Sequence, residues 1–78
     1  MIYLTLNQLK KSTPAVVVDL KGGHHLTKKL NAMGIRVGKE VTKVSDSFFR
    51  GPVTLEIDRA KVAIGHGMAD KILVKLVE

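Results

Sequence analysis

Apolar residues near the middle of the chain recur with helical spacing and stop at a glycine. Leu26, Leu30 and Met33 are separated by four and three positions, so they share one face of a helix. Gly34 follows where a helix often ends on a left-handed residue, and Ile35 would then pack back on Leu30. The pattern predicts a short amphipathic helix that begins near Leu26 and ends at Met33.

The other apolar positions cluster or alternate as they do in β-strands. Residues 15–20 are almost continuously apolar and rich in valine, which is typical of a strand buried on much of both faces. Residues 53–57 alternate apolar with polar side chains, so their apolar side faces a core. The predicted strands, in chain order, are residues 15–20, a half-buried strand after a turn at Val37 and Gly38 that contains Val41 and Val44, and residues 53–57, 61–64 and 71–77, with a tight turn over residues 65–70.

The amino-terminal leucines leave two alternatives open. Leu4, Leu6 and Leu9 fit either a single helical turn or an extended strand, and Pro14 ends whichever of these forms.

In the last strand, Ile72, Val74 and Leu76 share one face. The periodicities assign to the core the residues Val16, Val18, Leu20, Leu26, Leu30, Met33, Ile35, Val41, Val53, Leu55, Ile57, Ile64, Ile72 and Val74.

The number of short strands in so small a chain predicts the fold. The 78 residues allow one domain, 1–78, and a flat sheet of this size would leave one face unburied. We therefore predict a mainly β protein, a small SH3-like β-barrel with one short α-helix. The sequence has no cysteine, so apolar packing replaces disulfides and thiolate zinc sites. It has no signal-peptide pattern and no apolar run of membrane-spanning length, so nothing in the sequence itself predicts export or insertion into a membrane.

Positive charge is concentrated in residues 21–50. That segment has seven basic residues against two acidic ones, so it holds five of the six net positive charges. Such asymmetry favours an acidic partner, which is a phosphate, an anionic membrane surface or a carboxylate-rich protein; a merely solvated basic face is the alternative. The basic residues are Lys21, Lys28, Lys29, Arg36, Lys39, Lys43 and Arg50.

Several functions that need a defined motif find none. No spacing joins a serine or histidine nucleophile to a base and an orienting acid, and no phosphate-binding loop of the G-x4-GK[ST] type is present, so we predict no enzyme. Binders of single-stranded nucleic acid normally interleave aromatic side chains with basic ones, whereas this chain has only Tyr3, Phe48 and Phe49. We predict no nucleic-acid partner, and for the same reason no proline-rich peptide groove.

One combination of motifs resembles a known family. The order of a leucine-rich opening, a strand ending in two glycines, an L-x3-L-x2-MGI-x-x-G block and an A-x-x-I-x-V ending is similar to the ferrous iron transport protein A (FeoA) domain. The resemblance implies an SH3-like barrel in a small cytoplasmic protein that acts with the FeoB-like membrane permease of bacterial ferrous iron uptake. The residues that carry it are Leu6, Leu9, Gly22, Gly23, Leu26, Leu30, Met33, Gly34, Ile35, Gly38, Gly51, Pro52, Val62, Ala63, Ile64, Ala69, Ile72 and Val74.

Three histidines are the candidates for a metal site. Imidazole suits ferrous iron and zinc, and His24, His25 and His66 are the histidines of the chain. Adjacent residues of an extended strand point to opposite faces, so His24 and His25 converge on one ion only if the preceding glycines bend the chain. Asp19 or Asp70 would then add an oxygen ligand. The alternative to such a site is that these are exposed loop histidines with no metal role. The alternative to an accessory protein that acts by protein contact is a transition-metal-binding module similar to the SH3-like domain of iron-dependent repressors.

A basic face of the predicted helix is the candidate partner surface. Burying its apolar stripe leaves Lys28 and Lys29 outward, and Arg36 follows, with Lys39 and Lys43 nearby in sequence. Phe48 and Phe49 stand together, and strand alternation would bury only one of them; both rings plugging a barrel end is the alternative. We predict that Lys28, Lys29 and Arg36, with one phenylalanine, dock on an acidic surface of the permease's cytoplasmic G-protein domain. The membrane is then met only through the permease, and the oligomeric state is left open.

Overall fold

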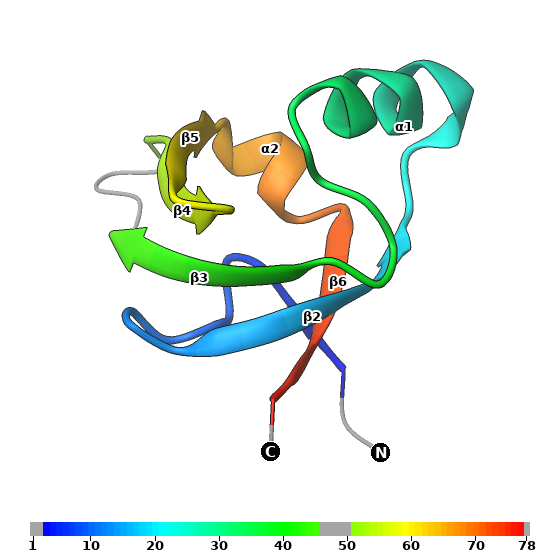
Figure 1. Cartoon of the computed structure of the whole chain (residues 1–78). Helices are drawn as coiled ribbons and strands as arrows, with labels where there is room; N and C mark the ends of the chain where they lie inside the picture. Colours follow the sequence, from blue (N-terminus) through cyan, green and yellow to red (C-terminus); the bar gives the residue numbers. More distant parts are fainter. Residues whose placement is uncertain (1–2, 46–50, 78) are drawn as a thin grey trace.

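The computed structural model describes residues 3–45 and 51–77, and this part of the chain folds into one curled antiparallel sheet with two helices (Figure 1). Neighbouring strands follow the order β1-β6-β2-β3-β4-β5, so the two outer strands, β1 and β5, are not paired to each other. The elements are β1 (Leu4–Thr5), β2 (Pro14–Leu20), α1 (Gly23–Ala32), β3 (Glu40–Ser45), β4 (Val53–Ile57), β5 (Ala60–Ile64), α2 (His66–Ala69) and β6 (Ile72–Leu76).

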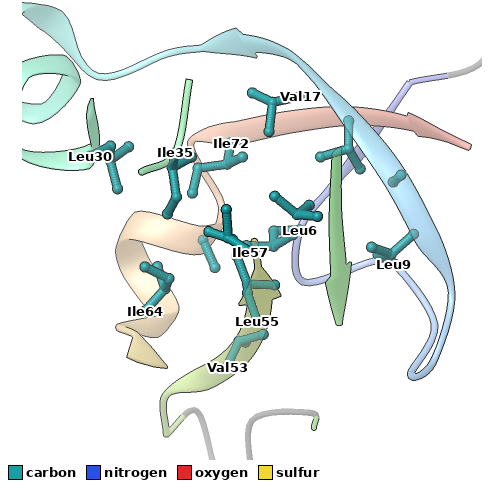
Figure 2. Close-up of a cluster of buried hydrophobic side chains, with 14 residues drawn as sticks. Leu6, Leu9, Val17, Leu30, Ile35, Val53, Leu55, Ile57, Ile64 and Ile72 are labelled. Carbon is teal, nitrogen blue, oxygen red and sulfur yellow. The ribbon is translucent and has the colours of Figure 1, made fainter. Parts of the chain in front are cut away.

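Buried side chains from every layer meet inside the curved sheet (Figure 2). The predicted mainly β character is confirmed, and most predicted core positions are buried. The prediction for β2 was wrong in phase, because Ala15 and Val17 face the core whereas Val16 and Val18 are only half-buried. A continuous apolar run carries no two-residue period, so pairing decides the phase: Val17 lies opposite the buried Val74, and the register shifts between Val17 and Asp19.

The amino-terminal segment combines both predicted alternatives. Leu4 and Thr5 pair with β6, and the chain then turns, with the Leu9 amide donating to the Thr5 carbonyl at 3.2 Å. This turn buries Leu6 and Leu9 completely, although neither was assigned to the core. Their spacing of three residues fits one helical turn, and their burial shows that the opening of the chain packs into the core.

Lys43 of β3 lies in the interior, which corrects its predicted place beside the basic face. Its side chain is 1% exposed, and its Nζ donates to the carbonyl oxygens of Asn7 at 3.2 Å and Leu9 at 2.7 Å. The strand alternates so that Val41 and Lys43 face inward, and Val44 is half-buried at a register shift between Lys43 and Ser45. Lys43 therefore does not belong to the basic surface.

The carboxyl end of α1 forms the predicted glycine stop. The amide of Ile35 donates to the Leu30 carbonyl at 2.9 Å, and the amide of Gly34 donates to the Asn31 carbonyl at 3.0 Å. Gly34 has φ of +91°, so the residues form a Schellman motif with Met33 as the cap. The start of the helix was wrong, because α1 begins at Gly23 and not near Leu26.

The last connection and the last strand each differ from prediction in one respect. Residues 65–70 contain a one-turn helix, α2, where a tight turn was predicted, and Ala69 of this helix is fully buried. Ile72 and Val74 of β6 are buried as predicted, but Leu76 is 51% exposed even though it lies opposite the buried Ala15. The core therefore ends before the last residue of β6.

We predict that Gly34→Ala and Gly38→Ala each lower the free energy of unfolding by about 1 kcal/mol or more. Both glycines have positive φ, of +91° and +92°, where a Cβ is strained. Gly65→Ala is the matched control, because Gly65 has φ of −60° and a Cβ there meets no atom within 4 Å. Denaturant unfolding of the three variants measures the difference, and equal stability of Gly34→Ala and Gly65→Ala would contradict the proposed helix stop.

We predict that Lys43→Met lowers the free energy of unfolding by about 1–3 kcal/mol, because the carbonyls of Asn7 and Leu9 lose a buried donor while the alkyl chain is kept. Lys75→Met is the control, since Lys75 is exposed on β6 and its replacement should change stability by less than about 0.5 kcal/mol. Denaturant unfolding decides, and a Lys43→Met protein as stable as the wild type would show that the buried ammonium does not tether the amino-terminal turn.

Candidate functional site

Helix α1 presents two exposed lysines, Lys28 and Lys29, away from its contact with the core. Leu30 is fully buried, and Leu26 and Met33 pack against the core from partly buried positions. Lys28 and Lys29 are exposed, and neither forms an ion pair within the described residues. The helical period places Lys28 opposite the packing side of α1 and Lys29 beside that side, and both are exposed as expected.

The loop from α1 to β3 presents Arg36 and Val37 on a backbone that is fixed at several points. Ile35 is fully buried, and the Lys39 amide donates to the Arg36 carbonyl at 3.0 Å. Gly38 occupies the third position of this turn with the positive φ that a type II turn requires. The loop is also bonded to β2, because the Gly38 amide donates to the Val17 carbonyl at 2.8 Å and the Val17 amide donates to the Lys39 carbonyl at 2.9 Å.

The hairpin of β4 and β5 brings an acidic residue against this loop. Its two-residue turn has positive φ at both Asp58 and Arg59, as in a type I′ turn, and Asp58 Oδ2 lies 2.5 Å from Nζ of Lys39. A shallow depression of about 390 Å³ lies between the loop and the turn. It is lined by Gly34, Arg36, Val37, Gly38, Lys39 and Asp58.

The predicted partner residues that the structure describes lie on two neighbouring segments of the chain. Lys28, Lys29 and Arg36 are all exposed, on α1 and on the loop that follows it. Lys39 is next to this group but its charge is paired with Asp58. Phe48 and Phe49, with Arg50, lie outside the described residues, so their part of the prediction stays a prediction.

Two of the residues that line the depression with a side chain, Val37 and Asp58, were not singled out from the sequence as parts of a site. Val37 had been placed in a turn, and a valine at a turn is a signal of exposure that was available. Val37 is 63% exposed. The approach of Asp58 to Lys39 had no sequence signal, because it depends on how the β4–β5 hairpin folds over the loop.

The histidines occupy different surroundings from those expected. His24 and His25 are exposed in the first turn of α1, not in an extended strand, so their side chains leave the helix about 100° apart. His66 begins α2, and its carbonyl accepts a hydrogen bond from Nδ2 of Asn7 at 3.0 Å, in addition to a further interaction of this residue. That same Nδ2 donates to Asp70 at 2.7 Å. Residues 3–45 and 51–77 contain no group of three His, Cys, Asp or Glu side chains arranged to hold a metal ion.

Fold and surface together define a small SH3-like module with an exposed basic face. The family model for the FeoA domain matches residues 4–76, and the chain therefore belongs to the FeoA domain family. A curated relative from Campylobacter jejuni, named for Fe(2+) transport, is 28% identical over 95% of this chain and 100% of its own length. Neither of the two helices of the described segments has the length and apolarity needed to cross a membrane.

Solved structures give the same fold. A crystal structure described as an iron uptake regulatory protein (FeoA) superimposes with a TM-score of 0.87 at 26% identity, over 99% of this chain and 100% of that one. ScaR with bound Zn2+ superimposes with a TM-score of 0.86 at 23% identity, over 95% of this chain but only 37% of that one. The predicted SH3-like fold is confirmed, and the likeness to ScaR concerns the fold alone.

We predict that a variant carrying His24→Gln, His25→Gln and His66→Gln folds, and that added zinc or ferrous iron raises the melting temperature of neither this variant nor the wild type. The first two side chains are exposed and diverge on α1, and the Asn7 bond to His66 uses the backbone carbonyl, which glutamine also has. Thermal melts with and without each metal, under anaerobic conditions for ferrous iron, provide the measurement. A metal-dependent rise in the wild-type melting temperature that disappears in the variant would instead establish a histidine metal site.

Proposed function

We propose that this chain is a small cytoplasmic accessory protein of bacterial ferrous iron uptake. It acts by contact with the cytoplasmic G-protein domain of a FeoB-like permease and has no chemistry of its own. Membership of the FeoA domain family and the names of its relatives support the iron-uptake setting. The contact mode rests on the basic surface, which we define as Lys28, Lys29 and Arg36.

The observation that carries the proposal is that the basic surface is exposed and has no internal counter-charge. None of its three cations pairs with a carboxylate within the described residues, whereas Lys39 beside them does. Unpaired surface cations attract an acidic partner over a distance of about one Debye length, roughly 8–10 Å at physiological salt. They therefore raise the rate of encounter more than they hold the complex together.

A metal-binding role is less well supported by the geometry. It would need imidazoles that converge, but His24 and His25 leave α1 in different directions, and His66 lies on a different helix. ScaR with bound Zn2+ is only 23% identical to this chain, and at that identity a shared fold does not imply a shared set of metal ligands. We therefore place partner contact before metal binding.

We predict that Lys28→Glu combined with Lys29→Glu slows association with the isolated permease G-protein domain about tenfold at low salt and weakens the salt dependence of the association rate. The dissociation rate should change less, because these charges lie on an exposed helix face. Stopped-flow or surface-based kinetics at two salt concentrations provide both rates.

The matched control is Lys10→Glu combined with Lys11→Glu, which changes the net charge equally. These exposed lysines precede β2, whereas the basic surface follows it, so they lie at the opposite end of that strand. Equal slowing by both pairs would mean that net charge and not this surface steers the partner. A wild-type protein that does not bind the domain at either salt concentration would contradict the proposed function itself.

A further inference from the structure

The depression between the α1–β3 loop and the β4–β5 turn lies next to Arg36 of the basic surface. We propose that it is the point at which the partner is gripped, and that it takes a protein segment with a carboxylate side chain beside an apolar one. Arg36 binds the carboxylate and Val37 packs on the apolar neighbour. The inference rests on the proposed function, since the segment is taken to belong to the permease G-protein domain.

The rim of the depression is held in place before any partner arrives. The loop is anchored from below by the buried Ile35 and along its backbone by the two hydrogen bonds that join it to Val17 of β2. Its other wall is a two-residue hairpin turn, tied to the loop through Asp58 and Lys39. A rim fixed by its own backbone loses little conformational freedom on binding, so contacts made there add to affinity with a small entropic cost.

The charges around the depression select where an acid group binds. Asp58 neutralises Lys39 and also repels a second carboxylate from that wall. Arg36, on the same rim, forms no ion pair within the described residues. A guanidinium presents parallel N–H donors that match a carboxylate in a bidentate pair, which an ammonium cannot reproduce. The arrangement therefore favours a carboxylate at Arg36.

Val37 adds an apolar contact immediately beside that cation. It is 63% exposed, the most exposed of the large apolar side chains for which the structure describes a position. A single exposed valine is ordinary on a protein surface, and alone it indicates nothing. Here it borders a depression, on a fixed turn, next to an unpaired guanidinium, which is the combination of apolar anchor and charge found at the centre of protein interfaces.

The test compares conservative variants by their dissociation rates from the permease G-protein domain. Arg36→Lys keeps the charge but loses the bidentate geometry, and it should dissociate about tenfold faster with an almost unchanged association rate. Val37→Thr keeps the shape but replaces a methyl group with a hydroxyl, which weakens the apolar contact, so it should dissociate about three- to tenfold faster. The matched controls are Arg59→Lys and Val77→Thr, both at exposed positions that do not line the depression, and both should dissociate as the wild type does.

The outcomes separate this inference from the proposed function. If the wild type binds the domain and Arg36→Lys and Val37→Thr dissociate at its rate, the depression is not the docking point, although the accessory role stands. If the wild type does not bind the domain, both proposals fail. Vesicles containing phosphatidylserine give the remaining comparison: wild-type binding to them that Arg36→Lys or Val37→Thr abolishes, without an effect on the domain, would make this a lipid-binding face and overturn the inference.

Discussion

The buried ammonium of Lys43 and the carbonyls that it contacts form the interaction on which the rest of the structure depends. In a core this thin, burying a lysine is costly unless its donors are satisfied, and two of the satisfying oxygens come from Asn7 and Leu9. The same residue accepts the Ser12 amide through its own carbonyl at 2.7 Å. Lys43 therefore bonds to both sides of the amino-terminal turn, which buries Leu6 and Leu9 and so completes the core.

This dependence runs in both directions. Detachment of the turn would expose Leu6 and Leu9 and remove hydrogen-bond acceptors from the buried Lys43 ammonium. Replacement of the lysine would leave buried carbonyl oxygens without this donor. Asn7 extends the connection to α2, because its Nδ2 donates to the carbonyl of His66 and to Asp70. A segment that contributes only a two-residue strand is thus held by polar contacts to both β3 and the helix before β6.

What could be predicted from the sequence was what local chemistry decides. The stop of α1 depends on Gly34 and its two neighbours, and the phase of β4 is visible in its own alternation, so both were correct. The predicted phase of β2 and the predicted outward direction of Lys43 were wrong. Cross-strand register and a bulge determine both, and these depend on the neighbouring strands. The exposure of Lys28 and Lys29 followed from the helical period, whereas the neutralisation of Lys39 by Asp58 joins residues that only the folded hairpin brings together.

In the short loop beside the depression, the residues that fix the backbone are different from the residues whose side chains are exposed. Gly34, Ile35 and Gly38 supply the backbone angles, the buried anchor and the bonds to β2, while the side chains of Arg36 and Val37 point to solvent and support nothing beneath them. Substitutions at such exposed positions usually change stability by less than about 0.5 kcal/mol, whereas a Cβ at either glycine would alter stability and rim geometry together. The shape of the loop therefore does not depend on the side chains of Arg36 and Val37. Their chemistry can match a partner without a constraint from folding.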